Sequence, residues 1–145
     1  MLYKGFDNQT YLISTADLKA RINDVILIDV RPAESYAAGH IAGTSHFDLY
    51  GISLNDTSPA PMEAFLSMFH HKFEFCGLTN KTPVVIYDDE TGERAARGVW
   101  LLAVLDHPDV RLLDGGVTAW VEAGNELTTV TAPVSYTHLR AHETE

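Results

Sequence analysis

Apolar positions recur along the chain in two alternating spacings, which predict strands and helices in turn. Short apolar runs predict strands at residues 10–14, 25–30, 45–49, 84–86 and 110–113. Apolar residues three or four apart predict helices between them, at residues 16–22, 32–38, 62–75, 93–105 and 117–123. Alternating strands and helices favour a parallel sheet covered on both faces. The expected fold is therefore a three-layer α/β/α domain with a central parallel sheet.

Capping and turn residues set the expected boundaries. Ser14 or Thr15 is expected to cap the first helix, and Pro32 suits the first position of the second. Residues 51–61 carry Asn, Asp and Pro and are predicted to be irregular. We assign residues 1–133 to one domain. The polar tail, residues 134–145, resembles translated cloning sequence and is predicted to be a disordered, non-native addition.

Composition excludes several classes of function. The 145 residues carry a formal net charge of −10, which argues against a nucleic-acid partner because phosphate contacts need clustered Lys and Arg. No run reaches the roughly 20 apolar residues of a membrane span, and the N-terminus lacks a signal-peptide core, so a cytoplasmic location is expected. The single cysteine, Cys76, permits neither an internal disulfide nor a thiolate zinc cluster and is expected to be a small buried hydrophobe. No cofactor or metal is predicted.

One strand–loop–helix segment carries the candidate chemistry. A strand that ends in a tight loop before a helix directs backbone N–H groups and the positive end of the helix dipole at one spot, which suits an anion. This loop is itself acidic and contains no cysteine, serine or lysine. The candidate site residues are Asp88, Asp89, Glu90, Thr91, Gly92, Glu93 and Arg94.

Three ordered motifs resemble those of rhodanese-family sulfurtransferases. The first is I-D-V-R-P-A-E-S-Y-A-A-G-H-I-A-G-T at residues 28–44. The second is V-V-I-Y-D-D-E-T-G-E-R-A-A-R-G-V-W-L-L at residues 84–102, and the third is V-R-L-L-D-G-G-V-T-A-W-V-E-A-G at residues 110–124. The similarity spans residues 10–127 and implies a rhodanese-like fold and a relation to enzymes that transfer sulfur from thiosulfate or 3-mercaptopyruvate.

The sequence departs from that family at the reacting atom. Active members carry Cys-x-x-Gly-x-Arg, whose thiolate holds the transferred sulfur as a persulfide. Counting back from Gly92 and Arg94 places Asp89 at the cysteine position. A carboxylate cannot form a stable, transferable bond to sulfane sulfur, although it would satisfy an anion-favouring loop. The chain alone is therefore expected to lack sulfurtransferase activity.

A finer resemblance is to the silent N-terminal half of two-domain members. That half keeps the fold without the cysteine and reads Tyr-Asp at this strand end, as Tyr87 and Asp88 do here. It implies a catalytic rhodanese domain as partner and a small sulfur donor at the interface. Candidate residues for substrate or interdomain contact are Asp29, Arg31, His40 and Arg97.

Each of those residues also has a purely structural interpretation. Asp29 and Arg31 could form an ion pair at the end of a buried strand, and Arg97 could pair with an acid at that end of the sheet. His40 could bond loop backbone, or support proton transfer as in some mercaptopyruvate-type relatives. Trp100 and Trp120 are expected in the core, unless a missing domain leaves one of them exposed.

Two other functions remain open from the sequence. A stand-alone, non-catalytic rhodanese-like binding module would have the same fold and the same loop. A magnesium-dependent phosphoryl-transfer or receiver-like domain would use acids at strand ends, namely Asp29, Asp88, Asp89 and Asp114. That second function also requires a Lys and a Ser or Thr at other strand ends, and neither is in place.

Overall fold

The structure, a computed structural model, describes residues 11–49 and 54–131; the predicted tail lies outside them. Within these residues, five parallel strands form one sheet in the order β1-β5-β4-β2-β3. They are β1 (Leu12–Ile13), β2 (Ile26–Asp29), β3 (Ser45–His46), β4 (Val84–Tyr87) and β5 (Val110–Leu113). In a parallel sheet all carboxyl ends lie at one edge, and this edge carries the candidate loop.

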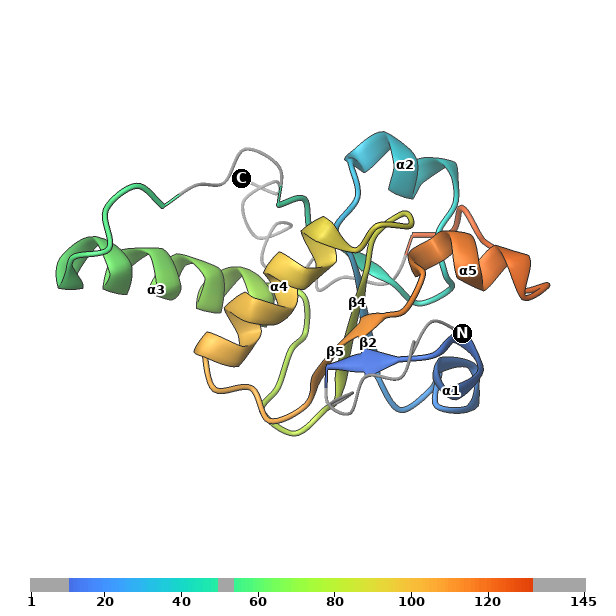
Figure 1. Cartoon of the computed structure of the whole chain (residues 1–145), viewed down its shortest axis with the longest axis horizontal. Coiled ribbons are helices and arrows are strands. Elements are labelled where there is room, and N and C mark those ends of the chain that lie inside the picture. Colours follow the sequence, from blue (N-terminus) through green and yellow to red (C-terminus); the bar gives the residue numbers. More distant parts are fainter. Residues whose placement is uncertain (1–10, 50–53, 132–145) are drawn as a thin grey trace, which may run out of the picture.

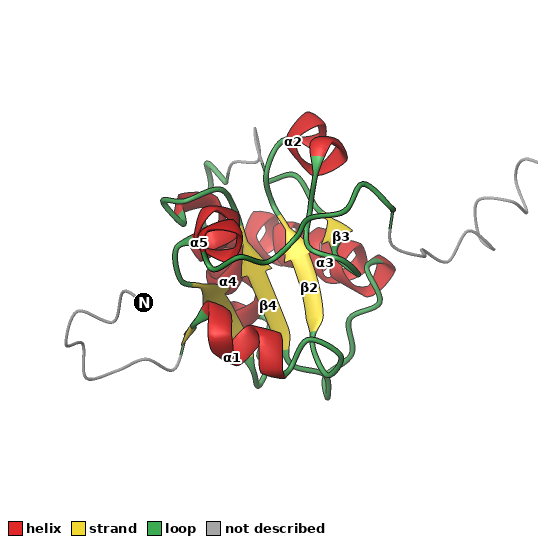
Figure 2. Ribbon diagram, turned by 90° about the vertical axis from the view of Figure 1, so that its right-hand side faces the viewer, coloured by secondary structure: helices red, strands yellow, loops and turns green. Residues whose placement is uncertain are grey.

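Helices cover both faces of the sheet, as the alternation of elements predicts (Figure 1). They are α1 (Thr15–Ala20), α2 (Ala33–Ala38), α3 (Pro59–Phe75), α4 (Glu93–Val104) and α5 (Gly116–Glu122). One face packs against α3 and α4, and the other packs against α1 and α5 (Figure 2). The short helix α2 lies beyond the carboxyl ends of the strands. The prediction of a three-layer α/β/α domain is confirmed.

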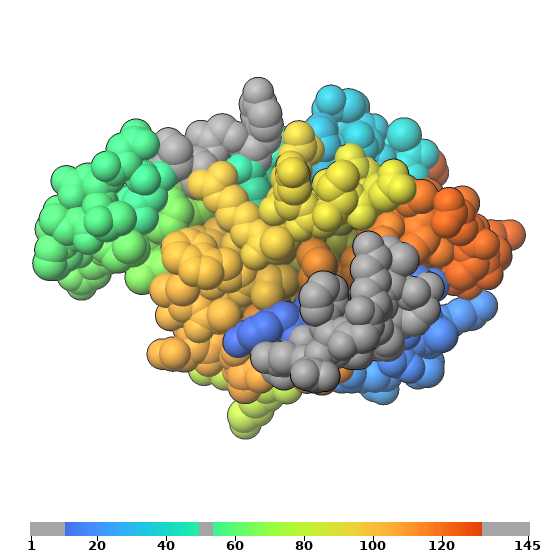
Figure 3. Space-filling model, in the orientation of Figure 1, coloured from blue at the N-terminus to red at the C-terminus, as the bar shows by residue number. Residues whose placement is uncertain are grey.

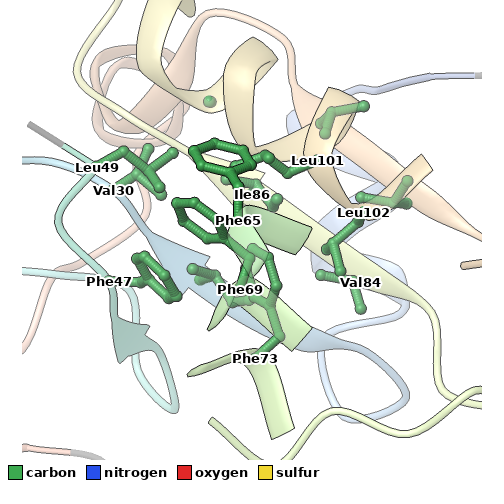
Figure 4. Close-up of a cluster of buried hydrophobic side chains, with 14 residues drawn as sticks. Val30, Phe47, Leu49, Phe65, Phe69, Phe73, Val84, Ile86, Leu101 and Leu102 are labelled. Carbon is green, nitrogen blue, oxygen red and sulfur yellow. The ribbon is translucent and has the colours of Figure 1, made fainter. Parts of the chain in front are cut away.

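Strand side chains alternate between two separate cores. In β4, Val84 and Ile86 enter the core under α3 and α4, where the aromatic rings of Phe65, Phe69 and Phe73 gather (Figure 4). Val85 and Tyr87 point to the opposite core under α1 and α5. Because successive residues of a strand point to opposite faces, a four-residue strand that is apolar throughout serves both cores.

The expected element boundaries hold within a few residues, with one clear correction. Ser14 caps α1 as predicted, and its Oγ accepts the Asp17 N–H at 3.1 Å. Helix α3 begins at Pro59, inside the stretch predicted to be irregular. Proline is tolerated in the first turn because the N–H it lacks has no partner within the helix. The last residues of the stretch predicted to be irregular, 59–61, therefore form the first turn of α3, whereas residues 54–58 lie outside any helix or strand.

The two tryptophans divide between core and surface. Trp120 is buried under α5, as predicted, whereas Trp100 on α4 is 49% exposed, so only one of the two tryptophans lies in the core. Together with Tyr11 and Leu112, Trp100 lines an apolar hollow beside the edge strand β1. No helix within residues 11–49 and 54–131 has the length and apolarity needed to cross a membrane.

Candidate functional site

The carboxylate of Asp88 occupies the point where the loop after β4 turns into α4. Its Oδ1 accepts the N–H of Gly92 at 3.0 Å, and its Oδ2 accepts the N–H groups of Arg94 and Ala95, both at 3.1 Å. These N–H groups lie at the positive end of α4, where an anion is stabilised. The expected anion-binding arrangement exists, and the chain's own carboxylate fills it.

The expectation that Asp89 would fill the loop is wrong. The Asp89 side chain is exposed, and its Oδ1 accepts the N–H of the next residue, Glu90, at 2.7 Å. Glu90, Thr91 and Glu93 are exposed as well. The loop therefore presents an acidic outer surface between α2 and α5 (Figure 3), while the carboxylate that faces the N–H groups is one residue earlier.

The backbone of the same loop is held by the N-terminal end of α5. The carbonyl of Asp88 accepts the N–H of Val117 at 2.9 Å, and the carbonyl of Asp89 accepts the N–H of Thr118 at 3.0 Å. Gly116 makes this approach possible: a Cβ there would lie 2.7 Å from the Asp88 carbonyl oxygen, and its φ is +60°. The Gly-Gly break in the third motif thus serves close backbone contact as well as chain reversal.

Asp29 and Arg31 form a buried ion pair at the end of β2. The Arg31 guanidinium donates from Nη2 to Asp29 Oδ2 at 2.7 Å and to the Gly39 carbonyl at 2.6 Å. Asp29 also accepts the backbone N–H of Arg31 at 2.9 Å. These two candidates are thus bonded to each other and to the loop that follows α2, the arrangement that their structural interpretation predicts.

Tyr87 is a member of this network that the sequence does not reveal. Its side chain is fully buried, and Tyr87 in β4 lies opposite Asp29 in the neighbouring strand β2. The hydroxyl accepts the Ile41 N–H at 3.1 Å and donates to Thr44 Oγ1 at 3.2 Å, which fixes the glycine-flanked loop against β4. A tyrosine at a strand end reads as a packing residue, so no sequence signal identifies this bond.

Burial and neighbouring charges shift several ionisation equilibria here. Burial raises the pKa of Asp88, and the nearby charge of Asp89 adds to the rise, while the three N–H donors oppose it. Burial likewise raises the pKa of Tyr87, reinforced by the charge of Asp29. Burial alone would lower the pKa of Arg31, but the bond to Asp29 and its charge raise it overall.

Three candidate residues, His40, Arg94 and Arg97, and the single thiol remain to be placed. His40 is fully buried, with both ring nitrogens on backbone carbonyl oxygens, in line with its structural interpretation. The half-buried side chains of Arg94 and Arg97 lie on the first two turns of α4. The only thiol, Cys76, follows α3 and lines a hollow with Lys72 and Phe75 that includes no residue of the acidic loop. Burial raises the pKa of this thiol.

The acids at the strand ends do not assemble a metal site. Across residues 11–49 and 54–131, no group of three or more His, Cys, Asp or Glu side chains is placed to hold an ion. Asp29 is bonded to a guanidinium and Asp88 to backbone N–H groups. Two of the four acids on which the magnesium-dependent alternative relies are therefore bonded to groups of the chain itself.

The fold and site define a class: a parallel α/β domain with an anion-cradling strand–loop–helix at the carboxyl edge of its sheet. Residues 14–123 match the family model described as "Rhodanese-like domain". The chain belongs to the rhodanese-like domain family.

Curated relatives and solved structures agree with this assignment. The chain is 33% identical over 118 residues to the thiosulfate sulfurtransferase of Azotobacter vinelandii, which covers 80% of this chain and 44% of the relative. It is 35% identical over 137 residues to a probable 3-mercaptopyruvate sulfurtransferase of Pseudomonas aeruginosa. This match covers 81% of this chain and 46% of the relative. The crystal structure of SseA from Escherichia coli superposes with a TM-score of 0.72 at 24% identity, covering 86% of this chain and 54% of that one. The chain thus spans about half the length of the curated relatives it matches.

Proposed function

We propose that this chain is the structural, non-catalytic rhodanese-like domain of a two-domain thiosulfate or 3-mercaptopyruvate sulfurtransferase. In this role it packs against a catalytic domain of the same family and helps to form the wall of a cleft for a small sulfur donor. The observation that carries the proposal is the Asp88 carboxylate, which takes the N–H groups of Gly92, Arg94 and Ala95. An oxygen anion in this place cannot hold sulfane sulfur, and it keeps an external anion out.

The chemistry of the single thiol supports the same proposal. A sulfur-transferring cysteine reacts as the thiolate and needs donors or positive charge that lower its pKa. Burial raises the pKa of Cys76, and the residues around its hollow are His46, Phe47, Asp48, Lys72 and Phe75. None belongs to the loop whose backbone N–H groups converge.

The length relation and the names of the relatives suggest the partner. Relatives named thiosulfate sulfurtransferase and probable 3-mercaptopyruvate sulfurtransferase are about twice as long as the matched region. A second domain of the same family is the simplest source of the missing nucleophile.

The proposal is tested by thiocyanate release from thiosulfate or 3-mercaptopyruvate in the presence of cyanide, with the purified chain and its Cys76→Ser variant. We expect both to match the enzyme-free blank. Activity in the native chain that disappears in Cys76→Ser would overturn the proposal, because it would make Cys76 a working nucleophile.

A paired substitution tests the reason for inactivity. In Asp88→Cys the thiolate would lie among the loop N–H groups and could attack the outer sulfur of thiosulfate. The S–S bond would break, its electron pair would leave with sulfite, and the protein would gain one sulfur atom. We expect this gain, measured by intact-protein mass spectrometry, in Asp88→Cys and not in Asp89→Cys. A gain of sulfur in Asp89→Cys and not in Asp88→Cys would show that the loop N–H groups face residue 89 instead.

A further inference from the structure

The last described residues of the chain, 128–131, return to the site edge and lie along His40; we call them the exit strap. The N–H of His40 donates to the Thr128 carbonyl at 2.9 Å, and the N–H of Thr128 donates back to the His40 carbonyl at 2.8 Å. This isolated antiparallel bridge lies outside the five-stranded sheet. Two backbone bonds alone are a weak attachment for an extended segment.

The imidazole ring adds a second attachment. Nδ1 lies 2.7 Å from the carbonyl oxygen of Tyr36 in α2, and Nε2 lies 2.7 Å from the carbonyl oxygen of Val130 in the exit strap. The Tyr36 ring stacks on the imidazole at 3.8 Å between centroids, with an 8° interplanar angle. The ring is fully buried, whereas Val130 is 72% exposed. The strap is therefore fixed through its carbonyl, without burial of the Val130 side chain.

We propose that His40 is a latch that fixes the exit strap to α2, and that the latch closes on both sides only when the imidazole is protonated. Carbonyl oxygens only accept hydrogen bonds, and a neutral imidazole has one N–H to donate. Both 2.7 Å contacts are hydrogen bonds at the same time only in the imidazolium form, which carries two N–H groups. Loss of the proton leaves either the Tyr36 carbonyl or the Val130 carbonyl without a donor, and either loss breaks the link that the ring makes between α2 and the strap. This inference does not depend on the proposed function.

Titratable and charged groups surround the latch on each packed element. From α2 comes the phenol of Tyr36, stacked on the ring, and from β3 comes His46, whose ring is tilted against Tyr36 at 5.1 Å. From the end of β2 come Arg31, which bonds the carbonyl just before His40, and its partner Asp29. Arg31 thus brings a charge of the same sign as an imidazolium, and Asp29 brings one of the opposite sign.

Amide hydrogen exchange, measured by NMR on the full chain, tests the latch. In His40→Gln we expect the Thr128 amide to exchange about tenfold faster, the order of effect of one lost hydrogen bond, with strand β4 unchanged. His46→Gln is the matched control: its ring belongs to the same cluster and bonds the Arg31 carbonyl, not the strap. Unchanged exchange at Thr128 in His40→Gln, or equal loosening in His46→Gln, would overturn the latch.

The native chain supplies a second measurement if His40→Gln does not fold. Ring-nitrogen NMR signals of His40 report its protonation across about pH 5 to 8, the range in which histidine changes charge in proteins. Corrected for base catalysis, Thr128 exchange should accelerate as the ring loses its second N–H. Titration of the ring with no change at Thr128, or a ring that holds one proton throughout, would overturn the proton-dependent latch.

Discussion

Replacement of Asp88 by alanine should destabilise the domain, because it removes the acceptor of three backbone N–H groups at once. A hydrogen bond to a charged group contributes about 1.5 to 3 kcal/mol, and a lost helix cap costs about 0.5 to 2 kcal/mol. The three bonds are not additive here, since water can reach the vacated cradle from the exposed Asp89 side. We expect a loss of about 2 to 4 kcal/mol in the free energy of unfolding.

The pH dependence of this loss follows from the raised pKa of Asp88. Because burial raises that pKa in the folded state, the native chain holds the proton more tightly than the unfolded chain does. The contribution of Asp88 to the free energy of unfolding is therefore fully present below about pH 4, the ordinary pKa range of a carboxyl group. It declines as the pH rises through the folded-state pKa. The stability gap between the native chain and Asp88→Asn should therefore be widest in acid and narrow toward neutral pH.

Urea unfolding of the native chain, Asp88→Ala, Asp88→Asn and Asp89→Ala across a pH series provides the assay. Asp88→Asn keeps one side-chain oxygen and should cost about half as much as alanine at neutral pH. Asp89→Ala is the control and should cost about 0.5 kcal/mol or less, because its carboxylate is exposed. Equal losses at residues 88 and 89, or a gap that widens toward neutral pH, would refute the reasoning.

Three further predictions concern the supports of the loop and the lone thiol. Gly116→Ala should cost about 3 kcal/mol by chemical denaturation, whereas Gly124→Ala, whose φ is also positive but whose Cβ would meet nothing within 4 Å, should cost about 1 kcal/mol. Tyr87→Phe should cost about 1 to 2 kcal/mol through the lost hydroxyl bonds. Because the Tyr87 pKa is raised, its contribution is full below about pH 10 and lost above it, so Tyr87→Phe should weaken the fall in stability at alkaline pH. Iodoacetamide should alkylate Cys76 at least about tenfold more slowly in the folded chain than in urea, and equal rates would contradict its partial burial.

The element pattern of this fold is readable from the sequence because each strand is short, apolar and separated by an amphipathic helix. The start of α3 at Pro59 is not readable in the same way, since proline suits both a turn and a first helical turn. The exposure of Trp100 is not predicted for a different reason. Helical spacing places this residue near the apolar face of α4, and the width of that face depends on the neighbouring strand β1.

The spacing of residues in the loop does not predict which carboxylate accepts the backbone N–H groups. Counting from Gly92 selects Asp89, yet consecutive residues at a strand end point in opposite directions, so a shift of one residue decides which carboxylate meets the N–H groups. The contact of Gly116 with the loop carbonyls joins two segments far apart in the sequence. Its only sequence signal is the Gly-Gly pair, which an ordinary turn would also explain.

The order of the strands has a consequence for how the chain reaches this structure. The first strand pairs with the last, Leu12 opposite Leu112, so the sheet closes a loop of about 100 residues. Such a closure costs on the order of 4 kcal/mol of chain entropy before β1 gains its partner. During synthesis β1 therefore cannot pair until β5 has been made. The loop after β4 likewise lacks its backbone hydrogen bonds until the first turn of α5 has been made. A ribosome-bound fragment that ends before residue 110 would lack both contacts, so the domain is expected to fold late and cooperatively.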